Sequence, residues 1–221
     1  MRSNALIGRL RRVAGALALT VVLLTGCSVV EVHSYTDPKM EVRREGAPRV
    51  CVVTVDMRPY IVSGDFPPSF TGIVHGFWGN ANAVLTASGQ PLAEEMSRAV
   101  AGGLRREGLD PVILTVPAGT SPDVIQRRLQ ECGAERTVTL RVNEWKTRTW
   151  MRTSATYDLD WYFRETTPTG KQEASHEHSG RENLGGNLGD PRGYARVAVQ
   201  RFFKRTIDEA LADPNVKRVL E

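Results

Sequence analysis

Residues 150–164 read WMRTSATYDLDWYFR and alternate between apolar and polar side chains. Such alternation is typical of an antiparallel strand with one face on a core and the other in solvent. The residues that would share the inner face are Met151, Thr153, Ala155, Tyr157, Leu159, Trp161 and Phe163. This segment therefore predicts a sheet with one buried face.

Two neighbouring segments extend this sheet. Residues 137–145 place Val138, Leu140 and Val142 on one face of a strand. Residues 171–180 would return beside residues 150–164 after a turn at Pro168. Their polar and charged composition is typical of an edge strand that resists pairing with another chain. Three strands in succession are therefore expected.

Helices and strands alternate in the first half of the chain. Residues 50–55 form an apolar, β-branched run that fits a central strand buried on both faces. Residues 91–107 and 121–132 carry apolar stripes at helical spacing, with a strand at 112–116 between them. These patterns predict two helices that connect strands of the same sheet.

A third helix is expected over residues 190–212, where another apolar stripe follows Asp190-Pro191. Together the patterns predict an α+β fold in the order β-α-β-α-β-β-β-α. Its centre would be one mixed sheet of about five strands, with the three helices packed mainly on one face.

Residues 57–89 are rich in glycine and show no helical period. We therefore expect a long loop here, with a short strand at 83–86. Loops of this length are uncommon in compact domains and are often functional. The aromatic residues in the loop are Phe66, Phe70, Phe77 and Trp78. They would either form a contact surface for a partner or fold back as a lid over the domain's own core.

The first 26 residues have the three parts of a secretory signal: a basic start, an apolar run at residues 13–24 and a small-residue cleavage site. Twelve helical residues reach only about 18 Å, which is too short for a hydrocarbon core of about 30 Å. Leu24-Thr25-Gly26-Cys27 resembles the lipobox of bacterial lipoproteins. The resemblance implies cleavage before Cys27 and its modification with acyl chains such as palmitate, and two or three chains give a lasting membrane hold.

The anchor suggests a division of the chain and a location. Residues 1–26 would be the signal peptide, residues 27–48 a flexible tether and residues 49–221 a single periplasmic domain. By resemblance to lipoprotein sorting, Ser28 in place of an aspartate favours the outer membrane. We therefore expect an outer-membrane lipoprotein whose domain faces the periplasm.

The charge balance argues against nucleic acid as a partner. The whole chain has 29 basic and 25 acidic residues, but four arginines lie in residues 1–26, where there is no acidic residue. The mature chain therefore has a formal charge of zero, without the excess of positive charge that binding to a phosphate backbone requires.

Cys51 and Cys132 remain once Cys27 is assigned to the anchor. An oxidising periplasm permits one bridge between them. Right-handed crossovers would place the start of the first strand and the strand after Cys132 at the same end of the sheet. The alternative is a pair of buried free thiols, which behave as small apolar groups.

No catalytic fingerprint was found: there is no Gly-x-Ser-x-Gly elbow, phosphate loop or dinucleotide motif. We therefore expect neither catalytic residues nor a cofactor. The strongest polar cluster pairs Asp158-x-Asp160 with His176-x-His178. A hairpin that matches Asp160 with His176 would assemble four metal ligands. A shift of one residue would instead place the histidines opposite Leu159 and Trp161, and the turn sequence leaves the register open.

The run VTVDMRP at residues 53–59 resembles the V-x-V-x-D-x-R strand that opens the small YajG-like lipoproteins of Gram-negative bacteria. The similarity continues through residues 91–116, 140–148 and 157–180, while residues 57–89 look longer than the family pattern. More distantly, the layout is similar to that of auxiliary lipoproteins of lipid-handling ABC transporters.

The resemblance implies a non-enzymatic envelope lipoprotein. We therefore expect a binding or assembly module at the outer membrane that contacts an unidentified envelope protein or lipid. The alternative is an auxiliary subunit of an ABC-type lipid or envelope transport system.

Overall fold

The computed structural model describes residues 31–35, 47–76, 78–168 and 170–220. The predicted signal peptide and the lipid attachment at Cys27 lie outside these residues. Among the described residues, no helix is long and apolar enough to cross a membrane.

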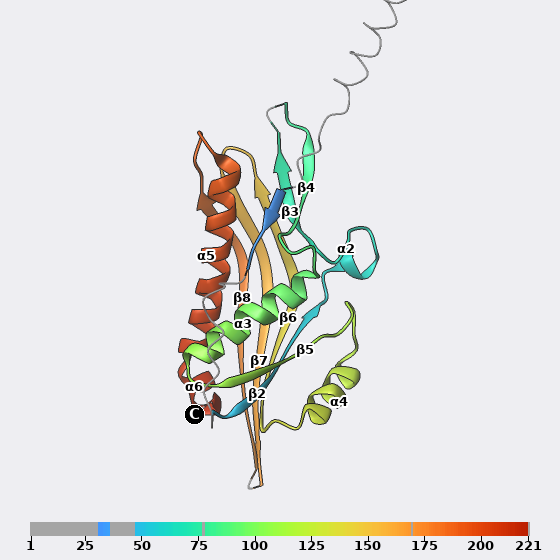
Figure 1. Ribbon diagram of the computed structural model, residues 1–221, viewed down its shortest axis with the longest axis vertical. Helices are drawn as coiled ribbons and strands as arrows, with labels where there is room; N and C mark the ends of the chain where they lie inside the picture. The colour runs from blue at the N-terminus through green and yellow to red at the C-terminus, as the bar shows by residue number, and fades with distance from the viewer. Residues whose placement is uncertain (1–30, 36–46, 77, 169, 221) are drawn as a thin grey trace, which may run out of the picture. The chain divides into compact units, whose positions relative to one another are not determined.

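The described chain forms eight strands and five helices (Figure 1). The strands are β1 (Glu31–His33), β2 (Arg49–Asp56), β3 (Phe70–His75), β4 (Ala81–Thr86), β5 (Asp110–Leu114), β6 (Arg136–Thr149), β7 (Thr153–Thr167) and β8 (Gly170–Gly185). The helices are α2 (Pro59–Val62), α3 (Leu92–Arg106), α4 (Pro122–Cys132), α5 (Pro191–Ala212) and α6 (Pro214–Leu220). The α+β class is as predicted.

All eight strands belong to one mixed sheet, in which β6 is the central strand. The first half of β6 pairs in parallel with β2, from Val50 opposite Arg136 to Asp56 opposite Val142. Its last three residues, 147–149, pair in parallel with β3. The other edge of β6 pairs with β7, and β7 pairs with β8. β6 has 14 residues, so its length lets one edge hold two shorter strands end to end.

The expectation of about five strands is wrong, chiefly because residues 57–89 contain a hairpin. Most of this segment was predicted to be loop, yet β3 and β4 pair antiparallel with each other. Gly72 explains part of the misleading pattern: a Cβ atom there would overlap the backbone carbonyl of Thr147 on β6. Glycine therefore serves close strand packing here rather than a flexible loop.

The predicted tether also needs correction at residues 31–35. β1 pairs in parallel with β4 at the edge of the sheet, with Glu31 opposite Val84. Tyr35 is buried, and its hydroxyl oxygen accepts a 2.9 Å hydrogen bond from Nε1 of Trp145. The folded domain thus begins well before residue 49, because a short segment adds an edge strand and an aromatic side chain to the core.

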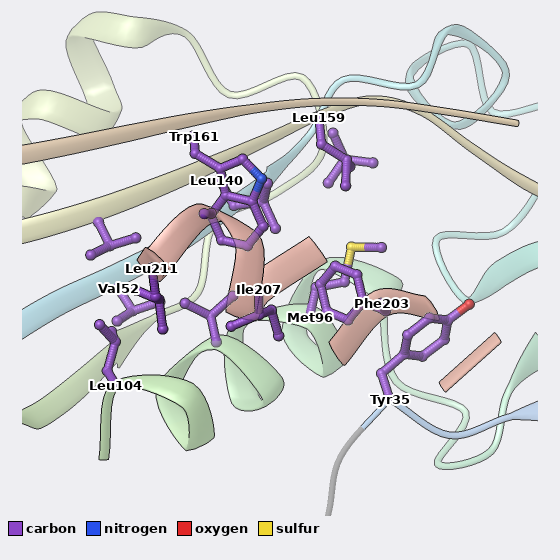
Figure 2. Packing of buried hydrophobic residues seen from close by; sticks show 14 of the residues in the cluster. Tyr35, Val52, Met96, Leu104, Leu140, Leu159, Trp161, Phe203, Ile207 and Leu211 are labelled. Atoms are coloured by element: carbon purple, nitrogen blue, oxygen red, sulfur yellow. The ribbon is translucent and has the colours of Figure 1, made fainter. Parts of the chain in front are cut away.

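The hydrophobic core lies between one face of the sheet and α3, α5 and α6. Met96 and Leu104 of α3 and Phe203 and Ile207 of α5 meet the sheet there, as Figure 2 shows. No helix was predicted after residue 212, where α6 lies. Its buried residues are Val216, Val219 and Leu220, at helical spacing. A helix of 7 residues, about two turns, gives too short a pattern to stand out from sequence alone.

His33 is fully buried in β1, with Nδ1 3.4 Å from Oγ1 of Thr71. Burial, and after it the charge of Arg196, lowers the pKa of His33 from 6.5 to about 4. The unfolded chain takes up this proton at a higher pH than the folded chain does. The stability is therefore complete above about pH 6.5 and is lost as the pH falls toward the folded-state pKa.

A change from about pH 7 to pH 5 is expected to lower the free energy of unfolding by about 2 kcal/mol through His33 alone. His33→Phe keeps a buried ring that does not titrate, so the variant should lose less stability over the same range. Urea unfolding at both pH values, followed by tryptophan fluorescence, measures the difference. Equal pH dependence in the two proteins would contradict this role of His33.

Candidate functional site

The face of the sheet opposite the core is only partly covered, and α4 lies against it. Ile125 and Leu129 of α4 point their apolar side chains toward this face and are half-buried. None of the residues of α4 is fully buried. Figure 1 shows α4 set apart from α3, α5 and α6. The helix therefore bounds a hollow instead of closing onto the sheet.

A groove of about 640 Å³ separates α4 from the sheet. This volume is within the usual range of ligand pockets, about 300–1,000 Å³. Its walls come from β2, α4, β6, β7 and β8 and from the segments before α4. The lining residues are Val55, Met57, Thr120, Pro122, Ile125, Gln126, Leu129, Thr137, Thr139, Arg141, Tyr162, Phe163, Arg164, Glu173, Ala174 and Ser175.

Alternation along the strands supplies the polar wall of the groove. Thr137, Thr139 and Arg141 occupy the odd positions of β6, whereas Val138, Leu140 and Val142 belong to the core on the opposite face. The part of the groove wall that β6 forms thus carries two hydroxyl groups and a guanidinium group. An extended ligand would meet a polar group at every second residue of β6.

An ion pair crosses the neighbouring strands. Arg164 of β7 lies opposite Glu173 of β8, and Nε of Arg164 donates to Oε1 of Glu173 at 2.7 Å. Both side chains are partly exposed, so this pair orients the guanidinium group without adding much stability.

A disulfide between Cys51 and Cys132 holds one end of α4 against β2, with the two Cα atoms 6.5 Å apart. β2 and β6 are parallel neighbours, and Cys51 lies opposite Thr137 in their register. Gly133 ends α4 with a φ angle of 69° and turns the chain into β6. The bridge therefore ties the C-terminal end of α4 to the sheet beside the groove.

The structure does not bring together the four candidate metal ligands. Trp161 pairs with His176 and Leu159 with His178, so both histidines lie on the face opposite Asp158 and Asp160. This is the register one residue away from the metal-binding alternative. In the part of the chain that the structure describes, no group of three or more His, Cys, Asp or Glu residues could hold a metal ion.

The two histidines instead join β8 to the helices on the core side. Nδ1 of His176 is 3.4 Å from Oδ2 of Asp213, and Nδ1 of His178 is 3.6 Å from Oε2 of Glu209. The ring of His178 also stacks on Tyr157, with centroids 4.9 Å apart. These contacts give His176 and His178 a structural role on the core-facing side of β8.

The structure does not bring the aromatic residues of the predicted contact surface together on one exposed surface. Phe70 is fully buried and stacks on Phe66 with ring centroids 4.2 Å apart, and Tyr60 meets both rings edge-on. A partner contact through Phe70 is therefore wrong, and Phe66 packs with it. Trp78 lies in the turn between β3 and β4 and is 90% exposed. Phe77 lies outside the described residues.

Sequence reasoning missed the role of Asp56 and Arg58. Their side chains are almost fully buried and form a two-point ion pair at 2.8 and 2.7 Å. Nη1 of Arg58 also donates to the carbonyl oxygen of Phe70 at 2.6 Å and to that of Trp145 at 3.3 Å. The pair therefore joins the end of β2 to β3 and β6, and this explains the V-x-V-x-D-x-R pattern as architecture.

Burial opposes the charge of Arg58, but hydrogen bonds to Asp56 and the attraction of its carboxylate outweigh this effect. The pKa of the Arg58 guanidinium is accordingly raised. The guanidinium group of Arg58 therefore stays charged inside the protein, where it bonds the side chain of Asp56 at two points.

The groove was missed as well. Its residues come from distant parts of the chain and form no motif. The alternation along β6 and β7 was the one sequence signal for the groove, since it separates the residues of the two faces of these strands. It could not show that α4 would pack over one of those faces.

No protein-family model and no curated protein matches this chain. Solved structures show a general likeness. A Xanthomonas campestris protein described with the family name DUF330 is 12% identical, with coverage of 82% of this chain and 91% of that one and a TM-score of 0.43. A hypothetical protein of Chlamydia trachomatis is 13% identical, with coverage of 74% and 95% and a TM-score of 0.41.

PelC from Paraburkholderia phytofirmans, a dodecamer, is 11% identical, with coverage of 72% of this chain and 86% of that one and a TM-score of 0.36. All three TM-scores are below 0.5, and no function is transferred from these proteins. None of the three is named as a YajG-like protein, so that resemblance stays a prediction from the sequence.

Proposed function

We propose that this protein is a lipid-anchored, non-catalytic module of the cell envelope, which binds an extended segment of a partner protein in the groove beneath α4. The observation that carries the proposal is the groove of about 640 Å³ between α4 and the sheet. The resemblance of residues 24–27 to a lipobox supports the anchor, and Ser28 supports an outer-membrane location with the domain facing the periplasm.

The lining of the groove suits a polypeptide. Ile125 and Leu129 of α4 offer apolar contacts, while Thr137 and Thr139 of β6 offer hydroxyl groups on the opposite wall. Protein interfaces combine an apolar centre with hydrogen bonds at the rim in this way. A strand-like segment that lies between α4 and the sheet would use both sets of contacts.

The arrangement of the polar groups supports a binding role over catalysis. Ser175 lines the groove, but its neighbour His176 faces the opposite side of β8, toward Asp213. A serine nucleophile needs its base within hydrogen-bond reach. Neither the sequence fingerprints nor this geometry favours acyl transfer.

An auxiliary subunit of a lipid transport system is the second candidate. Val55, Ile125, Leu129 and Tyr162 line the same groove and would accept an acyl chain. The two candidates differ in what occupies the groove, and one experiment separates them.

The test places a photo-crosslinking amino acid at Gln126, which lines the groove, and, as the control, at Arg128, an exposed residue of α4 that is not among the lining residues. In cells, the Gln126 position should yield a discrete protein adduct that the Arg128 position does not. An adduct with the mass of a lipid would support the transport candidate instead. Equal labelling at both positions, or none at Gln126, would contradict binding in the groove.

The anchor is tested separately. Cys27→Ser removes the thiol that lipoprotein processing would modify, so the precursor should stay unlipidated and leave the detergent-extracted outer-membrane fraction. Fractionation and mass spectrometry of the wild type and the variant measure this. A variant that fractionates like the wild type would show that Cys27 is not the anchor.

A further inference from the structure

Several large apolar side chains are exposed in three turns of the domain. Trp78, at 90% exposure, lies between β3 and β4. Trp150 and Met151, at 54% each, lie between β6 and β7. Leu188, at 80%, lies between β8 and α5. Single exposed apolar residues need no explanation, but a group of them marks an interaction site.

The strand register brings these three turns to one end of the sheet. β3 and β6 run in parallel, and Val74 near the end of β3 lies opposite Thr149, the last residue of β6. Thr149 pairs with Thr153 across the turn that holds Trp150 and Met151. Thr153 in turn pairs with Gly185, the last residue of β8. Figure 1 shows the three turns at the same end of the domain.

The chain enters the domain at this same end. β1 is parallel to β4, and β4 begins just after the turn that holds Trp78, so the first residue of β1 lies toward that turn. Cys27 precedes Glu31 by four residues. An extended chain covers at most about 3.6 Å per residue, so four residues span no more than about 14 Å.

This spacing links the turns to the membrane, and this step rests on the proposed lipid anchor. An acyl chain on Cys27 would hold the first strand within about 14 Å of its attachment point. Part of the segment expected to be a flexible tether, residues 27–48, is β1 itself. The end of the sheet that carries the exposed turns is therefore the end that the anchor brings to the lipid.

The chemistry of the turns fits a bilayer surface. Tryptophan is enriched at membrane–water interfaces because its ring is apolar and its N–H can meet headgroups. Arg148 and Arg152 are exposed beside Trp150 and suit lipid phosphates. Asp190, also exposed at this end, is engaged as the N-cap of α5 and accepts from the backbone N–H of Gly193.

We propose that the surface formed by Trp78, Trp150, Met151 and Leu188 is a second membrane contact, which enters the headgroup region of the leaflet that holds the anchor. The lipid chain supplies attachment, and these turns supply orientation. The groove beneath α4 is then held away from the bilayer. Cys132 at the end of α4 lies near the start of β6, and the turns lie at its other end. The 14 residues of β6 span about 45 Å at about 3.3 Å per residue.

The test measures fluorescence quenching of the full chain in vesicles of phosphatidylethanolamine and phosphatidylglycerol with brominated acyl chains. Trp145 and Trp161 are buried, whereas Trp78 and Trp150 are exposed. The fluorescence of the wild type should therefore be quenched more than that of the Trp78→Phe/Trp150→Phe double variant, by roughly threefold, because its exposed tryptophan rings enter the bilayer. Phenylalanine keeps the surface apolar, so attachment should not change.

A matched control adds a tryptophan far from the proposed surface. Val124→Trp, in the double-variant background, places an exposed ring on α4. Its emission should be quenched no more than that of the double variant. Equal quenching of the wild type, the double variant and the α4 variant would overturn the proposal, and so would the absence of quenching in vesicle-bound wild type.

The outcome can be told apart from failure of the anchor. Residues 1–30 contain no tryptophan, so the signal reports the folded domain whether an acyl group or an uncleaved signal segment holds the chain. The mass of the Cys27 peptide shows separately whether that residue is acylated. Concentration-dependent self-association without lipid that is lost in Trp78→Ser would assign the surface to a second copy and reject the membrane contact.

Discussion

Replacing Arg58 with methionine is expected to lower the free energy of unfolding by about 3–5 kcal/mol, because the substitution leaves the buried carboxylate of Asp56 without its partner. That loss is a large share of the total stability of a typical domain, about 5–15 kcal/mol. Urea unfolding followed by tryptophan fluorescence measures it.

The size of the effect follows from the number of contacts. Arg58 is 0% exposed, and its guanidinium group bonds Asp56 at two points and the carbonyl oxygens of Phe70 and Trp145. Without Arg58, these carbonyl groups also lose a donor. Arg58→Lys should recover part of the stability, because lysine keeps the charge but not the forked geometry.

Two controls isolate the buried pair. The double variant Asp56→Leu/Arg58→Met removes both charges and should be less destabilised than the sum of the single variants. Arg128→Met removes an exposed partner of Glu131 and should change stability by no more than about 0.5 kcal/mol. If Arg58→Met matched Arg128→Met, the pair would not have the structural role assigned to it.

The second large effect concerns the disulfide. Replacing Cys51 and Cys132 with alanine is expected to cost about 4 kcal/mol, because the bridge closes a loop with a sequence separation of 81 residues in the unfolded chain. Thermal unfolding of the variant and of the wild type with and without reductant measures this. The reduced wild type and the alanine variant should unfold at similar temperatures.

The same change should loosen α4. The helix has no fully buried residue, so the bridge supplies much of its attachment at the C-terminal end. Crosslinking from Gln126 should therefore become weaker in the alanine variant, while hydrogen exchange of α3 stays slow. Thiol counting in denatured, unreduced protein gives the direct check: reactive thiols at both Cys51 and Cys132 would contradict the bridge.

Much of the fold was predictable because single elements carried strong local patterns. The alternation of residues 150–164 predicted β7, and the apolar run at residues 50–55 predicted β2, an inner strand between β5 and β6. The stripe of Leu92, Met96 and Leu104 predicted α3 as a core helix. Each of these elements buries enough apolar surface to show its period in the sequence.

The missing elements lacked such a pattern for separate physical reasons. β1 has three residues, too few to reveal alternation. β3 contains Gly72, which fits against the backbone of β6 instead of adding an apolar side chain. The candidate site was harder still, because α4 and the strands that form the groove are adjacent only in the folded sheet. The register that separated Asp160 from His176 depends on a hairpin whose turn allowed either pairing.

The central place of β6 has a consequence for the order in which the chain can fold. β3 and β2 do not pair with each other, and β6 follows both of them in the sequence and joins the two parts of the sheet. A chain delivered from its N-terminus therefore cannot close its sheet until Thr149 has arrived. Long-range pairing of this kind folds slowly, since loop closure must come first. If the chain is exported as the proposed lipoprotein, such late closure would favour an extended precursor, the form that passes through a translocation channel.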